Sequence, residues 1–124
     1  MTNQSSFNRS PFIKLQDVKP DSQGISLVLK VASIVYTADH GEKKFTVLKV
    51  GDDTASIDLF LEGQDFREGV TLVLRNVIVM MVKGLIRLEL GKWSKISEAK
   101  VPAGFSVNRL VDLSAVAYEE VYGQ

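Results

Sequence analysis

Apolar and polar residues alternate along much of the chain in the short segments that are typical of β-strands. Residues 25–36 (ISLVLKVASIVY) and 44–50 (KFTVLKV) are rich in β-branched and aromatic residues, and the polar run TADHGEK between them predicts a hairpin loop. The GDDT run at residues 51–54 has the composition of a tight turn, and the alternation in SIDLFLE, residues 56–62, predicts a third strand.

Two more predicted strands follow after a short polar interruption. Residues 70–82 (VTLVLRNVIVMMV) predict a fourth strand, the Lys-Gly step at 83–84 a two-residue hairpin loop of a primed type, and residues 85–91 a fifth strand. The interruption itself, GQDFREG at 63–69, has room for about one or two helical turns with Phe66 as its apolar anchor.

This order of elements predicts an all-β OB-fold, a five-stranded Greek-key barrel with a short helical connector between strands 3 and 4. The chain of 124 residues is sized for one domain. We expect residues 1–11 to be a disordered leader, residues 12–100 the OB-fold domain and residues 101–124 a C-terminal extension packing on the barrel. Within it, residues 113–121 are ambiguous between helix and strand, and we favour an extended segment that returns along the barrel.

Composition excludes several classes of site. The chain has no cysteine and one histidine, so disulfides, iron–sulfur clusters and thiolate zinc sites are ruled out, and we expect no metal and no cofactor. Lysine plus arginine and aspartate plus glutamate number 15 each, so any anion-binding surface must be local. With no secretory signal and no apolar run of bilayer length, we expect an intracellular protein, in the nucleus or the cytoplasm, with no membrane partner.

Catalysis is not indicated. Asp52 and Asp53 are adjacent carboxylates, but their place in the GDDT run is explained by turn chemistry. His40 lies beside Gly41 in the predicted loop without a candidate catalytic partner in the sequence, and no phosphate-binding glycine loop or nucleophile elbow is present. We therefore predict a protein that is not an enzyme.

Three segments carry a family resemblance: FIKLQDVKPDSQGISLVLKV at 12–31, VGDDTASIDLFL at 50–61 and LVLRNVIVMMVKGLIRLELGKWSKI at 72–96. In this order they resemble small single-OB proteins related to replication protein A, above all the plant-type eukaryotic subgroup, whose tails are also similar to DLSAVAYE. The resemblance implies non-catalytic binding of single-stranded DNA or RNA, with bases stacked on exposed aromatic rings and the backbone followed by lysine and arginine. At positions where the single-stranded DNA-binding members carry aromatic residues, this chain has Glu62, Ile78, Val82 and Glu89.

Candidate binding residues follow from the resemblance and from strand alternation, which turns Phe45, Lys49 and Phe60 outward. The stacking candidates are Phe45, Phe60 and Trp93, and the phosphate candidates are Lys43, Lys44, Lys49, Arg75, Lys83, Arg87 and Lys92. Purely structural roles for these residues also stay open: Phe45 and Phe60 could form a pair that stabilises the sheet, the Trp93 ring could close the barrel mouth, and Arg87 could simply be solvated. The choice between DNA and RNA also stays open, since contacts to the 2′-hydroxyl leave no short motif.

The apolar run of the fourth strand favours a second function, a protein-interaction module or subunit of a larger complex. The run places apolar groups on both faces of the strand, at Val77, Ile78, Val79, Met80, Met81 and Val82. One face belongs to the core, and the other must be covered by the C-terminal segment with Val116 and Tyr118, by a protein partner, by a second copy or by bases.

Overall fold

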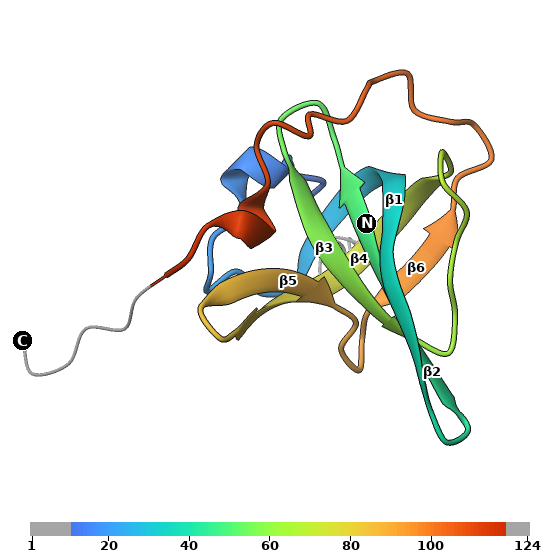
Figure 1. Cartoon of the computed structure of the whole chain (residues 1–124). Coiled ribbons are helices and arrows are strands. Elements are labelled where there is room, and N and C mark those ends of the chain that lie inside the picture. Colours follow the sequence, from blue (N-terminus) through green and yellow to red (C-terminus); the bar gives the residue numbers. More distant parts are fainter. Residues whose placement is uncertain (1–10, 119–124) are drawn as a thin grey trace, which may run out of the picture.

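Six strands make up most of the computed structural model, which describes residues 11–118 (Figure 1). The strands are β1 Ile25–His40, β2 Lys43–Gly51, β3 Ser56–Glu62, β4 Thr71–Val82, β5 Leu85–Glu89 and β6 Lys95–Glu98, with 3₁₀ helices η1 Leu15–Asp17 and η2 Leu113–Ala115. Residues 1–10 of the expected leader lie outside the described part. Within residues 11–118 the helical segments are three residues each, and none is long and apolar enough to cross a membrane.

The sheet closes into a ring. Its strands follow the order β1-β2-β3-β5-β4, and β4 pairs back to β1. All neighbours are antiparallel except β3 and β5, which are joined by the two parallel pairs Leu59–Leu88 and Phe60–Glu89. This topology confirms the five-stranded OB-fold. The sixth strand, β6, was not expected, and it extends the sheet by pairing with β4 from Leu72 to Arg75.

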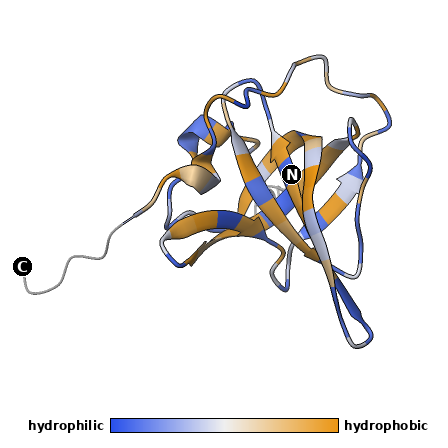
Figure 2. Ribbon diagram, in the orientation of Figure 1, coloured by the Kyte–Doolittle hydropathy of each residue, from blue (hydrophilic) through white to orange (hydrophobic). Residues whose placement is uncertain are grey.

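Strand β1 is long enough to serve two neighbours, which is what closes the barrel. Its first part pairs with β4 and its second part with β2, and register shifts between Val31 and Ser33 and between Ile34 and Tyr36 bend it. The ladder continues to His40, so the predicted TADHGEK loop is wrong. Only residues 41–42 form the turn, because polar residues at the exposed hairpin tip can still pair through their backbones (Figure 2).

The core lies inside the ring, and strand alternation predicts its members correctly. Ile57, Leu59 and Leu61 of β3 are buried, as are Leu48 and Val50 of β2. Burial of a side chain of this size contributes roughly 1.5–3 kcal/mol, so the alternation on β2 and β3 specifies which strand faces point inward.

The two predicted connectors of the barrel had different outcomes. At Lys83 and Gly84 the φ angles are +54° and +82°, which confirms a hairpin turn of the primed type. The predicted helical connector between β3 and β4 is wrong, because residues 63–70 contain one bend and one turn and no helix. Phe66 nevertheless packs against the core as the expected anchor, so a single apolar contact is enough to hold this segment without helical hydrogen bonds.

The N-terminal segment is fixed by the carboxylate of Asp52. This side chain is buried and accepts the backbone N–H of Leu15 at 2.9 Å, together with those of Thr54 and Ala55 in its own turn. Turn chemistry for Asp52 is therefore confirmed. The same group also joins η1, whose Leu15 is fully buried, to the end of β2.

The segment after β6 arches over the barrel and descends beside β3 and β5 (Figure 1). Residues Leu113–Ala115 form η2 rather than the start of an extended segment, because the Asp112 carboxylate accepts the Ser114 N–H at 3.0 Å and supports a helical turn. The end of the expected segment, residues 119–121, lies outside the described residues. Farther along, the Tyr118 N–H donates to the Gly84 carbonyl at 2.8 Å, so the tail reaches the β4–β5 turn.

Candidate nucleic-acid interface

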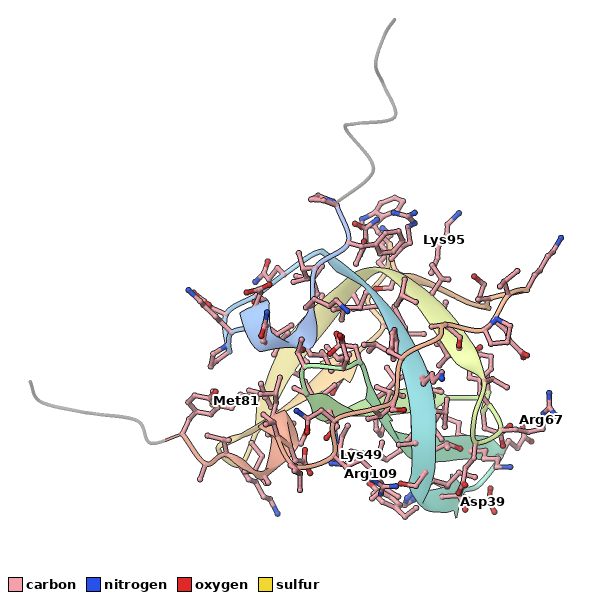
Figure 3. The ribbon with its side chains drawn as sticks, turned by 90° about the horizontal axis from the view of Figure 1, so that it is seen from above. Asp39, Lys49, Arg67, Met81, Lys95 and Arg109 are labelled. Carbon is pink, nitrogen blue, oxygen red and sulfur yellow. The ribbon has the colours of Figure 1, made fainter. Side chains whose placement is uncertain are left out.

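The predicted binding residues fall on two separate surfaces. The barrel face is the outer side of β2, β3 and β5, and it carries Phe45, Lys49, Phe60 and Arg87. The tryptophan surface lies where β4, β6 and the N-terminal segment meet, and it carries Phe12, Arg75, Lys92, Trp93 and Lys95. Figure 3 shows Lys49 and Lys95 on opposite sides of the molecule. Lys83 lies apart from both, in the β4–β5 turn, and Lys43 and Lys44 begin β2 beside the hairpin tip.

Three of the predicted residues on the barrel face form one stack. The rings of Phe45 and Phe60 lie 5.5 Å apart at an interplanar angle of 25°, and the Arg87 guanidinium lies 4.3 Å from the centroid of Phe60. The His40 ring meets the edge of Phe45 at 5.5 Å. The two phenylalanines thus make the cross-strand contact given above as their structural alternative, and both are only partly exposed.

Every predicted cation on or beside the barrel face has a carboxylate partner. Lys49 Nζ lies 2.6 Å from oxygens of both Asp58 and Asp112, and Arg87 Nε donates to Glu89 at 2.7 Å. At the hairpin, Lys43 and Lys44 lie 3.5 Å from Glu62 and 3.4 Å from Asp65. A phosphate approaching this face would therefore have to compete with an existing ion pair at each of these cations.

The pKa of Lys49 reflects its two partners. Partial burial by itself would lower the pKa of this ammonium, but the carboxylates of Asp112 and Asp58 outweigh it and raise the pKa above the ordinary 10.5. Lys49 is therefore held as a cation in an ion triad between β2, β3 and the tail.

Two glutamates add to the negative charge of the barrel face. Glu62 and Glu89, at positions where the resembling proteins carry aromatic residues, line a shallow hollow of about 180 Å³ with Phe60 and Leu90. Carboxylates at short range from a phosphate repel it. The barrel face thus has stacked rings and little free positive charge.

Trp93 is strongly exposed, which rules out the alternative that it closes the barrel mouth. The residue is 76% exposed, and Lys92 Nζ lies 5.3 Å from the centroid of its ring. The turn that carries it is held by Ser94, whose hydroxyl accepts the Gly91 N–H at 2.8 Å and donates to the Asn76 carbonyl at 2.5 Å. The ring is therefore presented to solvent by a hydrogen-bonded turn.

Beside the turn lies a groove of about 290 Å³. Gln23 and Trp93 line it together with Asn76 and Ile78. Ile78 occupies another position where the resembling proteins carry an aromatic residue. In this chain Trp93, from the turn after β5, lines the same groove as Ile78. The groove thus combines apolar and aromatic lining with side-chain amides.

Arg75 and Lys95 face each other directly across β4 and β6. The Arg75 guanidinium also lies 4.2 Å from the centroid of the Phe12 ring. Among residues 11–118, no carboxylate lies within ion-pair distance of Arg75, Lys92 or Lys95. The sequence interpretation missed Phe12 and Lys95, because it placed neither β6 nor the pairing that brings Lys95 beside Arg75.

No metal centre is formed by the described part of the chain, where no group of three or more histidine, aspartate or glutamate side chains is arranged to hold an ion.

Comparison with known proteins agrees with the fold. An Arabidopsis thaliana protein described only as uncharacterized is 34% identical over 137 residues, covering 95% of this chain and 88% of its own length. The solution structure of a hypothetical Arabidopsis thaliana protein matches with a TM-score of 0.77 and 26% identity, covering 100% of this chain and 94% of that one. The OB domain of a Thermoplasma acidophilum protein shares the fold, with a TM-score of 0.65 and 22% identity over 78% of this chain and 94% of that domain.

Residues 18–98 match the family model of the single-stranded DNA-binding protein Ssb-like OB fold. The matched segment runs from just after η1 to the end of β6 and contains every strand of the barrel. The OB barrel of this family is a binding fold and is not typically catalytic. The chain therefore belongs to the Ssb-like OB-fold family.

Proposed function

We propose that this protein binds single-stranded nucleic acid without catalysis. The observation that carries the proposal is Trp93, left 76% exposed beside Lys92 on a barrel of the Ssb-like family. A tryptophan buries a large apolar area when it packs, so a ring held in solvent by a hydrogen-bonded turn is better explained by a ligand than by folding. Stacking of a base on such a ring contributes about 1–3 kcal/mol and needs no particular sequence.

The same proposal includes the finer relation to replication protein A suggested by the sequence motifs. Either DNA or RNA serves as ligand, since both present unstacked bases. The absence of cysteine supports a reducing, intracellular compartment.

Binding should be weak and sensitive to salt. The net charge is zero and the tryptophan surface offers three cations without ion-pair partners in the described residues, Arg75, Lys92 and Lys95. Each phosphate neutralised on a single strand contributes about 0.7 to the slope of log affinity against log salt. Three contacts would therefore produce a slope of roughly −2.

The test is a titration with labelled single-stranded DNA and RNA, followed by anisotropy and by Trp93 fluorescence at low and at physiological salt. We expect saturable binding that weakens with salt and quenches Trp93. Trp93→Ala, followed by anisotropy alone, should weaken binding about 5- to 150-fold, the equivalent of one lost stacking contact. Leu110→Ala is the control, because Leu110 is 98% exposed in the tail. A flat anisotropy with both nucleic acids at tens of micromolar protein would overturn the proposal.

A second candidate, a protein-interaction module, is favoured by the end of the β4–β5 hairpin. Val77 and Val79 belong to the core and Ile78 is half-buried, but the side chains of Met80, Met81, Val82 and Leu85 are 38–41% exposed. Tyr118 of the tail lies beside this end and lines a hollow of about 470 Å³ with Met81, Lys83 and Gly84. The tail as far as Tyr118 therefore covers the apolar hairpin only in part.

Light scattering after size exclusion tests self-association at this hairpin. A dimer that Met81→Lys dissociates would support contact between two copies. A monomer at high concentration would argue against it.

A further inference from the structure

The pairing of Arg75 with Lys95 across β4 and β6 supports an inference about where the nucleic acid lies. Residues directly opposite in an antiparallel ladder project to the same face, and like charges in that arrangement destabilise the sheet. The neighbouring pair, Leu74 and Ile96, packs toward the core, so Arg75 and Lys95 project outward. With no carboxylate of residues 11–118 within ion-pair distance of either, an anion between them would relieve the repulsion.

Phe12 restricts the position of the Arg75 guanidinium, which would bind such an anion. The guanidinium lies 4.2 Å from the centroid of the ring, and the segment that carries the ring is held by the Ile13 N–H, which donates to the Ser26 carbonyl at 3.0 Å. Stacking holds the plane of a guanidinium while leaving its N–H edge able to donate to a phosphate. Phe12 thus restricts Arg75 without neutralising it.

Arg87 on the barrel face can be compared with Arg75, because each lies over a phenylalanine ring. Arg87 stacks on Phe60 at 4.3 Å, almost as Arg75 stacks on Phe12, but its Nε donates to Glu89 at 2.7 Å. The two arginines therefore lie at nearly the same distance from a phenylalanine ring and differ in whether a carboxylate already occupies a donor. Of these two arginines, Arg75 is the one with no carboxylate of residues 11–118 within ion-pair distance, so its charge stays available for a ligand.

The groove beside Trp93 adjoins the cation pair through Asn76, the residue after Arg75. Asn76 has a φ of +55°, a left-handed conformation that interrupts the regular alternation of β4 next to the cations. In the groove, the side chains of Trp93 and Ile78 suit the face of a base, and the side-chain amides of Gln23 and Asn76 can form hydrogen bonds with the edge of a base. The site therefore offers a place for a base next to a place for a phosphate.

We propose that Arg75 and Lys95 clamp a backbone phosphate while the adjoining base enters the groove beside Trp93, so that the strand crosses the tryptophan surface and not the barrel face. This inference rests on the proposed function and names its site.

The test compares Arg75→Gln/Lys95→Gln with Arg87→Gln, using anisotropy of a labelled single-stranded oligonucleotide across a salt series. The first variant should lose about tenfold or more in affinity, and its salt slope should fall by roughly 1.4, the share of two phosphate contacts. Arg87→Gln should stay within about twofold of the unchanged protein, since its cation is already paired. A large loss with Arg87→Gln and none with the double variant would overturn the inference while leaving the proposed function standing.

Stability without ligand provides a second readout. Removing one of two facing cations should raise the urea midpoint of Lys95→Gln at low salt, and the rise should shrink as salt screens the repulsion. A midpoint that falls at low salt would show that the pair is not repulsive, and would overturn the inference. If the unchanged protein binds no oligonucleotide at all, both the proposed function and its site are wrong.

Discussion

The Ser114 hydroxyl donates a hydrogen bond of 2.7 Å to the Ile86 carbonyl, which joins the tail to β5. The same oxygen accepts the Asp58 N–H at 2.8 Å, so one side chain bridges β5 and β3. The bridge lies where direct pairing between these strands is missing, because their ladder consists only of Leu59–Leu88 and Phe60–Glu89. Ser114 therefore joins the strands of the ring where their ladder has the fewest residue pairs.

Ser114→Ala should lower the free energy of unfolding by about 1–3 kcal/mol, because it leaves a backbone N–H and a carbonyl without their partner in a largely buried position. Urea denaturation measures the loss. Ser106→Ala is the matched control, since Ser106 lies exposed in the same tail and should change stability by less than about 0.5 kcal/mol. Equal effects of the two substitutions would argue against the bridge.

The ion triad of Lys49 predicts a loss of stability at alkaline pH. Because the folded-state pKa is raised above 10.5, the contribution of Lys49 is fully present below that value and is lost as pH rises through the folded-state pKa. Asp112→Asn removes one partner and should lower the free energy of unfolding at pH 7 by about 1.5 kcal/mol.

The readout is the difference between the unchanged protein and Asp112→Asn, because pH effects common to both proteins cancel in that difference. Urea midpoints from pH 8 upward should converge above the ordinary lysine pKa of 10.5. A constant difference between the two proteins over that range would contradict the prediction.

Gly51 is required for the close approach of the tail to the end of β2. A Cβ placed there would lie 2.6 Å from the Ala55 carbonyl oxygen and 2.5 Å from Val107 Cγ1, and the first of these is backbone that cannot swing aside. Gly51→Ala should therefore cost about 1–3 kcal/mol through overpacking. Gly104→Ala is the control, because a Cβ there meets nothing within 4 Å. Thermal unfolding of the two variants should separate them, and a Gly51→Ala midpoint equal to that of Gly104→Ala would count against the clash.

Thr46 holds a hydroxyl that the fold does not use. The residue is fully buried, and its oxygen has no hydrogen-bond partner among the described residues. Thr46→Val should raise the free energy of unfolding by about 1 kcal/mol, because it removes a buried polar group at nearly constant volume. Thr71→Val should have the opposite effect, since the Thr71 hydroxyl accepts the Ala103 N–H at 3.0 Å. Chemical denaturation that shows Thr46→Val to be destabilising would contradict this account.

Local pattern was enough for the parts of the fold that depend on near neighbours. Alternation in β2 and β3 correctly predicted the inward residues of both strands, but it turned Val47 outward, where the structure buries it. The Lys-Gly step at 83–84 predicted a turn that requires positive φ at both positions. The four-residue β6 has no comparable pattern of its own, since its only partly buried apolar residue is Ile96. It becomes a strand because β4 offers an open edge from Leu72 to Arg75.

The candidate site divides in the same way. The sequence by itself determined an OB barrel with rings and cations in reach of its surface, because a period of two and turn chemistry act over a few residues. Which cations stay free was decided only by the tertiary structure. Asp112 reaches Lys49 across 63 positions of sequence, while β6 sets Lys95 against Arg75 with no carboxylate of residues 11–118 within ion-pair distance of either. Charge pairing depends on distances in space, and for residues far apart in the chain only the folded barrel sets those distances.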